Sequence, residues 1–273
     1  MHDWLAALVL GIVEGLTEFL PVSSTGHLIL AGELLGFVGE RAGTFEIFIQ
    51  LGAILAVVWL YRERFARLLA DGLAGRALVP RPGEPGLTWT HLAVAMAPVL
   101  VAGLLLHGTI RAHLFTSATV LVGLVVGAVY MVGAELAARR RPAAAGSLDT
   151  LSLHQALGIG CLQCLSLWPG FSRSGATIGG GLLAGLDRRT AAEFSFVLAV
   201  PVMVAATGYD LFRSLALLDR DFGVTLAVGF VVSFLVAWAA VVGFLKVVGR
   251  VSLVPFAVYR VALAAAWALV VLR

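Results

Sequence analysis

Six stretches of this chain are apolar for long enough to cross a membrane as a helix, which requires about 20 mostly apolar residues. Apolar types make up 60% of the 273 residues, charged types only 13%, and the mean hydropathy is +0.98. These values exclude a soluble globular enzyme, a disordered chain and a disulfide-rich secreted domain. We therefore predict an all-α polytopic membrane protein in which residues 1–273 form a single integral membrane domain. The six predicted transmembrane helices cover residues 44–61, 88–106, 115–134, 193–212, 222–245 and 252–272.

Two further apolar stretches, 4–36 and 151–186, are interrupted in the middle by residues that break helices. The first is broken by the run PVSSTG at residues 21–26, and the second by the run PGFSRSG at residues 169–175. Irregular backbone is tolerated inside a membrane only where it is buried in protein or lines a wet cavity. Each stretch is therefore predicted to be a re-entrant helical hairpin that enters the membrane and returns to the same side.

The two interrupted stretches are related to each other by a shift of 149 residues without gaps. Each of them is also followed by a predicted span. We interpret the match as an internal duplication, with repeats of about 1–136 and 151–273, whose hairpins meet near the middle of the membrane. The identities at this offset join Gly11 with Gly160, Leu16 with Leu165, Ser23 with Ser172, Gly26 with Gly175, Ile29 with Ile178 and Phe45 with Phe194.

The distribution of basic residues predicts that these repeats have inverted topology. Cytoplasmic loops of membrane proteins are enriched in Lys and Arg. Placing the basic linker 62–87 in the cytoplasm puts twelve Lys and Arg residues inside and five outside, with Arg173 and Arg260 at membrane depth. Both termini then lie outside, and the two hairpins enter from opposite faces. We accordingly expect the basic residues behind the net charge of +3 to set the orientation in the membrane and not to bind nucleic acid.

Ionisable groups at membrane depth are costly and mark function by default. In the first hairpin, Glu14 and Glu18 are four residues apart and share one helix face. A divalent cation such as Mg²⁺ is commonly held by one or two carboxylates beside phosphate oxygens, so both are candidate metal ligands. Ser24 and His27 are three residues apart and are expected to face together. They suit a hydroxyl nucleophile with an imidazole base, or an imidazole that itself attacks phosphorus or protonates a leaving group.

The second hairpin provides a cation in place of these acids. Arg173 lies between Ser172 and Ser174, and Gly175 and Thr177 follow. An Arg fork combined with main-chain N–H groups at a helix N-terminus forms an anion site that suits phosphate. Together, the side chains of the two hairpins indicate that the protein transfers a phosphoryl group at the membrane. The apolar part of its substrate would stay in the lipid.

Both interrupted stretches contain a long, specific run of residues. Residues 14–27 are EGLTEFLPVSSTGH, and residues 168–177 are WPGFSRSGAT. These runs resemble the E-G-x-T-E-F-L-P-(I/V)-S-S-T-G-H and P-G-x-S-R-S-x-x-T signatures of the undecaprenyl-diphosphate phosphatase (bacitracin-resistance) family. The resemblance implies an enzyme of the bacterial cytoplasmic (inner) membrane that hydrolyses undecaprenyl diphosphate to the monophosphate. It also implies recycling of this lipid carrier for cell-wall synthesis, bacitracin resistance, a site open to the periplasmic face and a divalent cation, Mg²⁺ or Ca²⁺.

The resemblance further implies roles for individual residues. Glu14 and Glu18 would serve the metal or the proton chemistry. Ser24 and His27 would be the nucleophile and its partner in either order, with water as a further nucleophile. Arg173 would stabilise charge on the phosphate oxygens. The candidate substrate-binding residues are all hydroxyl side chains, some with helix capping as an alternative role: Ser23, Thr25, Ser172, Ser174 and Thr177.

Several alternatives stay open from the sequence. A transporter or flippase of a polyprenyl phosphate would use the same inverted-repeat site, whereas a purely structural membrane protein would leave the buried charges unexplained. Arg173 is alternatively a structural ion-pair partner of Glu14 or Glu18. Glu46 either lines the site or holds a hairpin, and Arg260 is expected to have a carboxylate partner. The expected partners are a polyprenyl diphosphate and membrane lipid, and the oligomeric state, a homodimer among the options, is not determined.

Overall fold

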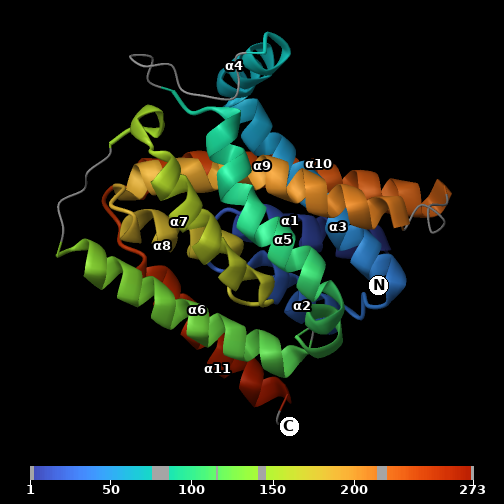
Figure 1. The fold of residues 1–273 in the computed structure, drawn as a ribbon. Coiled ribbons are helices and arrows are strands. Elements are labelled where there is room, and N and C mark those ends of the chain that lie inside the picture. Colours follow the sequence, from blue (N-terminus) through green and yellow to red (C-terminus); the bar gives the residue numbers. More distant parts are fainter. Residues whose placement is uncertain (1–2, 76–85, 115, 141–145, 214–219, 272–273) are drawn as a thin grey trace.

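The protein is described by a computed structural model that covers residues 3–75, 86–114, 116–140, 146–213 and 220–271. Every regular element in these ranges is a helix (Figure 1). Within the same ranges, five helices are long and apolar enough to cross a membrane, and a sixth, α11, is apolar but shorter. The predicted class, an all-α polytopic membrane protein, is confirmed. The six helices are α3 (Glu40–Leu60), α5 (Trp89–His113), α6 (Ser117–Ala138), α9 (Arg188–Arg213), α10 (Arg220–Val247) and α11 (Val254–Val271).

The two interrupted stretches each form a pair of helices joined by an irregular turn, as predicted. Proline cannot donate the hydrogen bond that a helix needs at its position, and serine is a strong N-cap. The first helix of each hairpin therefore ends before Pro21 or Pro169, and the second begins directly after Ser23 or Ser172. The first hairpin consists of α1 (Asp3–Thr17) and α2 (Ser24–Leu35), and the second of α7 (Leu153–Gln163), the short 3₁₀ helix η2 (Cys164–Leu167) and α8 (Arg173–Leu183).

The two hairpin turns share an unusual backbone geometry. Ser23 and Ser172 have φ angles of 73° and 78°, and they are the non-glycine residues with positive φ in the described part of the chain. Each serine hydroxyl accepts a hydrogen bond from the N–H three residues later, at 3.4 Å from Gly26 and 3.1 Å from Gly175. Such a backbone conformation costs a non-glycine residue roughly 1–3 kcal/mol, so the surrounding structure has to hold both turns. The two serines are 149 residues apart, the offset found in the sequence.

Helices of the two halves pack against each other in matching pairs. Helix α1 packs on α10, and α7, which occupies the corresponding place in the second half, packs on α5. Glycines allow both pairs to approach closely. A Cβ on Gly11 would lie 2.8 Å from the carbonyl oxygen of Gly229, and a Cβ on Gly160 would meet the carbonyl oxygen of Ala95. In addition α3 packs on α9 and α6 on α11, so the spans hold both hairpins inside the molecule.

The chain is helical directly after α3, where the sequence predicted a linker over 62–87. Helix α4 (Arg62–Leu73) follows α3 after a break at Tyr61 and projects from the rest of the molecule (Figure 1). Its Arg64 forms an ion pair with Asp149 in the short 3₁₀ helix η1 (Leu148–Thr150), with 2.7 Å between Nη1 and Oδ1. The hydrogen bond from Arg64 lowers the pKa of Asp149, so this pair is charged at neutral pH and is lost only in acid. Residues 76–85, in the remainder of the predicted linker, lie outside the described residues.

A glycine notch in α6 receives the turn of the second hairpin. A Cβ on Gly123 would meet the carbonyl oxygen of Pro169 and the main chain of Gly170. We expect Gly123→Ala to lower the free energy of unfolding by about 1–3 kcal/mol, because the added methyl group has to displace the turn. A Cβ on Gly133, in the same helix, meets nothing within 4 Å, so Gly133→Ala should instead raise stability by about 0.5–1 kcal/mol. Denaturant unfolding in detergent measures the free energy of unfolding of both variants. Equal changes in the two variants would show that the turn does not require a glycine at position 123.

Candidate active site

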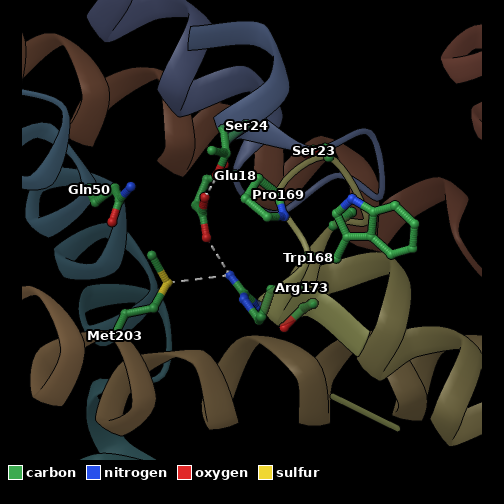
Figure 2. A pocket seen from close by; sticks show the side chains of 12 residues that line it. Glu18, Ser23, Ser24, Gln50, Trp168, Pro169, Arg173 and Met203 are labelled. Atoms are coloured by element: carbon green, nitrogen blue, oxygen red, sulfur yellow. Dashed lines mark hydrogen bonds and ion pairs between the residues drawn. The ribbon is translucent and has the colours of Figure 1, made fainter. Parts of the chain in front are cut away.

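A cavity of about 140 Å³ lies where the two hairpin turns meet the spans α3 and α9. Figure 2 shows the carboxylate of Glu18 in this cavity, between Ser24 and Arg173. Four separate segments of the chain therefore contribute side chains to one small polar space. The wall includes Glu18, Ser23, Ser24 and Thr25 from the first hairpin, Trp168, Pro169, Gly170, Ser172 and Arg173 from the second, Gln50 from α3 and Met203 from α9.

Glu18 joins the two hairpins. Its Oε1 lies 2.7 Å from Nη2 of Arg173, and its Oε2 accepts a hydrogen bond from the hydroxyl of Ser24 (Figure 2). The side chains of Glu18 and Arg173 are only 6% and 13% exposed. Burying a charge alone is costly, so each member of this ion pair depends on the other. The structure therefore brings together the acidic and basic residues that the sequence places on separate hairpins.

The two groups that hold Glu18 come from corresponding positions in the two hairpins. Ser24 is the first residue of α2, Arg173 is the first residue of α8, and they are 149 residues apart. Helix N-termini carry partial positive charge and unpaired N–H groups, and they bind anions such as phosphate. Two helix ends and a guanidinium therefore converge on the cavity. This arrangement suits a ligand with more than one negative charge.

The guanidinium of Arg173 is held from several sides. Its Cζ lies 5.4 Å from the centre of the Phe19 ring. Its Nη1 donates to the carbonyl oxygen of Ser195 at 3.2 Å, and its Nη2 lies 3.6 Å from Sδ of Met203. Its Nε is buried and has no hydrogen-bond partner within the described ranges. The protein thus fixes the position of this cation and leaves one of its donors unsatisfied.

Two of the predicted substrate-binding hydroxyls are used within the protein instead. Ser174 donates to the carbonyl oxygen of Leu20 at 2.8 Å, which ties the two hairpin turns together. The hydroxyl oxygens of Thr177 and Ser195 are 2.6 Å apart, which ties α8 to α9. Both predicted residues are buried and lie outside the cavity wall. The other three predicted hydroxyls do line the cavity: Ser23, Thr25 and Ser172.

His27 does not pair with Ser24, contrary to the expectation from their spacing. Its Nδ1 lies 2.7 Å from the carbonyl oxygen of Ser23, and its Nε2 lies 2.7 Å from the hydroxyl of Tyr259 on α11. A carbonyl oxygen can only accept, so Nδ1 carries a proton, and in the neutral imidazole Nε2 accepts from Tyr259. The two rings also stack, with centroids 5.6 Å apart. No hydrogen bond therefore joins the predicted pair, because Ser24 donates to Glu18 and both nitrogens of His27 have other partners. Their catalytic roles stay a prediction.

Glu14, one helical turn before Glu18, is fully buried. Neither of its carboxylate oxygens has a hydrogen-bond partner in the described part of the chain. Over the same residues, no group of three His, Cys, Asp or Glu side chains is placed to hold a metal ion by itself. A divalent cation that also binds phosphate oxygens needs only one or two carboxylates from the protein. The oxygens of Glu14 are unpartnered and Glu18 lines the cavity, whereas Glu14 lies outside the cavity wall.

Some residues at the site are not predicted from the sequence. Met203 lines the cavity, and its side chain is not ionisable and so is not conspicuous in an apolar span. Gln50, which is four residues after Glu46 and is a buried candidate with it in the sequence, lines the cavity, whereas Glu46 does not. Ser195, which contacts Arg173, lies 149 residues after Glu46. The offset of the duplication is therefore the one sequence signal that points to it.

Arg260 lacks the carboxylate partner that was expected for it, within the described ranges. Its side chain is fully buried in α11. Its Nη2 donates to the carbonyl oxygen of Gly170 at 2.7 Å and to that of Gly123 at 3.2 Å, and its Nη1 lies 3.2 Å from Sδ of Met131. Main-chain carbonyl oxygens thus take the place of an acid, a role that side-chain patterns in a sequence do not reveal.

Comparisons with known proteins agree with these features. Residues 7–266 match the family described as "Bacitracin resistance protein BacA". A protein of Nitratidesulfovibrio vulgaris (strain DP4) named undecaprenyl-diphosphatase is 54% identical over 264 residues, which cover 97% of each chain. Proteins named undecaprenyl-diphosphatase 1 from Bacillus thuringiensis (strain Al Hakam) and Bacillus cereus (strain ZK / E33L) are both 52% identical, over 97% and 100% of each chain. With matches of this extent and identity, the chain belongs to the BacA family of bacitracin resistance proteins.

Proposed function

We propose that this protein hydrolyses undecaprenyl diphosphate to undecaprenyl phosphate and inorganic phosphate, and so recycles the lipid carrier used in cell-wall synthesis. The observation that carries the proposal is the carboxylate of Glu18, held between Ser24 and Arg173 at the ends of two helices. One cavity thereby offers a hydroxyl nucleophile, a base and a cation for a phosphate. The lipid itself is taken from the names of the relatives. Apolar spans around the hairpins are suited to a substrate whose isoprenoid chain stays in the membrane.

In the proposed reaction, Ser24 is the nucleophile and Glu18 is its base. The hydroxyl of Ser24 already donates to Glu18, so its proton passes to the carboxylate as the oxygen attacks the terminal phosphorus. The bond between that phosphorus and the bridging oxygen breaks, and the lipid monophosphate leaves with the proton from Glu18, which makes Glu18 a carboxylate again. Water then attacks the phosphoserine with Glu18 as base, which releases inorganic phosphate and restores the serine. The alternative is a direct attack by a water molecule that Glu18 activates.

Arg173 and the two helix ends would bind the charge of the substrate. Phosphoryl transfer spreads negative charge over the phosphate oxygens, and fixed donors aimed at those oxygens stabilise the transition state. Arg173 lines the cavity, so its guanidinium is placed to donate to the substrate while it stays paired with Glu18. Ser23, Thr25 and Ser172 line the same cavity and are the proposed hydroxyl contacts of the diphosphate.

We also propose that the site uses a divalent cation, Mg²⁺ or Ca²⁺. Glu14 and Glu18 would hold it together with oxygens of the diphosphate. The ion would neutralise part of the charge of the diphosphate. The carboxylate oxygens of Glu14 support this role, because a buried acid without protein partners needs either a proton or a cation.

The placement in the membrane is part of the same proposal. The matching turns at Ser23 and Ser172 and the matching helix packings support an internal duplication with repeats of about 1–136 and 151–273. Together with the bias of basic residues, they support inverted repeats in the bacterial cytoplasmic membrane, with the site open to the periplasmic face. The same architecture is found in secondary transporters. Movement of the lipid monophosphate across the membrane is therefore the second candidate function.

Phosphate release from a prenyl diphosphate tests the function directly. We expect the full chain, purified in detergent, to release phosphate from a long-chain prenyl diphosphate when Mg²⁺ or Ca²⁺ is present. EDTA should suppress the release, and activity that persists in EDTA would remove the proposed metal role. Sealed vesicles with labelled prenyl phosphate test the second candidate. Lipid movement without any release of phosphate would favour transport and contradict hydrolysis.

A further inference from the structure

Arg260 is a buried cation that the proposed reaction does not use. It is the largest fully buried side chain in the described part of the protein. Its contacts are two carbonyl oxygens and a sulfur atom, all of them uncharged. A buried charge without a counter-charge is expensive to maintain. In a membrane protein such a residue is expected to contribute to a site rather than to stability.

The guanidinium of Arg260 lies directly behind the wall of the cavity. Gly170 forms part of that wall, and its carbonyl oxygen is the 2.7 Å acceptor of Nη2. A Cβ on Gly175, in the first turn of α8, would lie 3.3 Å from Nη1. Arg260 therefore binds the turn that precedes α8 and lies close to the first turn of α8 itself. Arg173 is the residue with which this helix begins.

This placement is unfavourable until an anion arrives. The N-terminus of a helix carries partial positive charge, so a cation beside it is repelled. The cavity already contains Arg173, and its acid, Glu18, is engaged in the ion pair with that residue. A bound diphosphate reverses the sign of the interaction with Arg260. Because Coulomb energy is proportional to the charge of the ligand, the gain is larger for a diphosphate than for a monophosphate.

We propose that Arg260 is a positioning and specificity residue. Through Gly170 it holds the turn at 168–172 in place, and through its uncompensated charge it makes the cavity prefer a diphosphate to a monophosphate. The consequence is that substrate binds well while the monophosphate products are released. The inference rests on the proposed hydrolysis, but it concerns equilibrium binding and is testable without turnover.

Equilibrium binding of inorganic pyrophosphate and inorganic phosphate to the full chain tests the proposal. Isothermal titration calorimetry in detergent, at fixed pH and ionic strength, gives both affinities. We expect Arg260→Met to weaken pyrophosphate binding about tenfold or more and phosphate binding clearly less. Arg260→Lys keeps the charge but loses the planar fork, so it should recover most of the preference for pyrophosphate. In the hydrolysis assay, the KM of Arg260→Met for a prenyl diphosphate should rise more than its kcat falls.

A second, half-buried arginine provides the control. Arg188 of α9 donates to the fully buried carboxylate of Glu135, and neither residue lines the cavity. Arg188→Met should lower the unfolding temperature and leave the ratio of the two affinities unchanged. Equal weakening of both ligands in Arg260→Met, or no recovery of the preference in Arg260→Lys, would overturn the inference. A wild type that prefers pyrophosphate but hydrolyses no prenyl diphosphate would refute the proposed function and leave the inference intact.

Discussion

Glu18→Gln is expected to lower kcat for phosphate release from a prenyl diphosphate by about 10²- to 10⁴-fold, the usual contribution of a positioned base. Glutamine keeps the size of the side chain and can still accept a hydrogen bond from Ser24. Its amide cannot take the proton of the serine, and it cannot balance the charge of Arg173. Initial rates of phosphate release, measured on purified variants in detergent, give the change.

Two further variants make this result specific. Glu33→Gln is the matched control, because Glu33 is an exposed residue of α2 that contacts Ser117 and not the cavity. It should keep the wild-type rate. Ser24→Ala should lose as much activity as Glu18→Gln if the serine attacks phosphorus, and it should keep much of its activity if water attacks instead. A Glu18→Gln variant that works at the wild-type rate would show that Glu18 is not the base.

The architecture is largely predictable from the sequence because the membrane restricts the choices. Apolar stretches of sufficient length have to become helices, and a polar interruption has to be enclosed by protein. The positions of the hairpin turns at Ser23 and Ser172 follow from these rules and from the offset of 149 residues. So does the meeting of Glu18 with Arg173, since two buried opposite charges need each other.

The contacts within the site are much less predictable. Helical spacing suggests that Ser24 and His27 face together. It does not show that Tyr259, 232 residues after His27, forms a hydrogen bond with the imidazole. Arg260 is bound by carbonyl oxygens, which every residue possesses and which leave no pattern in a sequence. The helical conformation of α4 was likewise not predicted, because its many charged residues are also typical of a linker. In each case the deciding partner comes from a distant segment or from the main chain.

Arg173→Met is expected to be damaging in two separate ways. It leaves Glu18 buried without a cation, which should cost about 3–5 kcal/mol of unfolding free energy. It also removes the donor that stabilises charge on the phosphate oxygens, which should lower kcat by about 10²- to 10³-fold. Arg173→Lys keeps the charge but cannot reproduce the several contacts of the guanidinium, so its loss of activity should be smaller but clear.

The double variant Glu18→Gln/Arg173→Met separates the two effects. With both charges removed, no charge stays buried alone, so stability should return most of the way to the wild-type value. Catalysis should not return, because the base and the phosphate-binding cation are both missing. Denaturant unfolding in detergent gives the stabilities, and phosphate release gives the rates. If the ion pair were only structural, activity and stability would recover together in the double variant, whereas a pair that belongs to an active site makes them diverge.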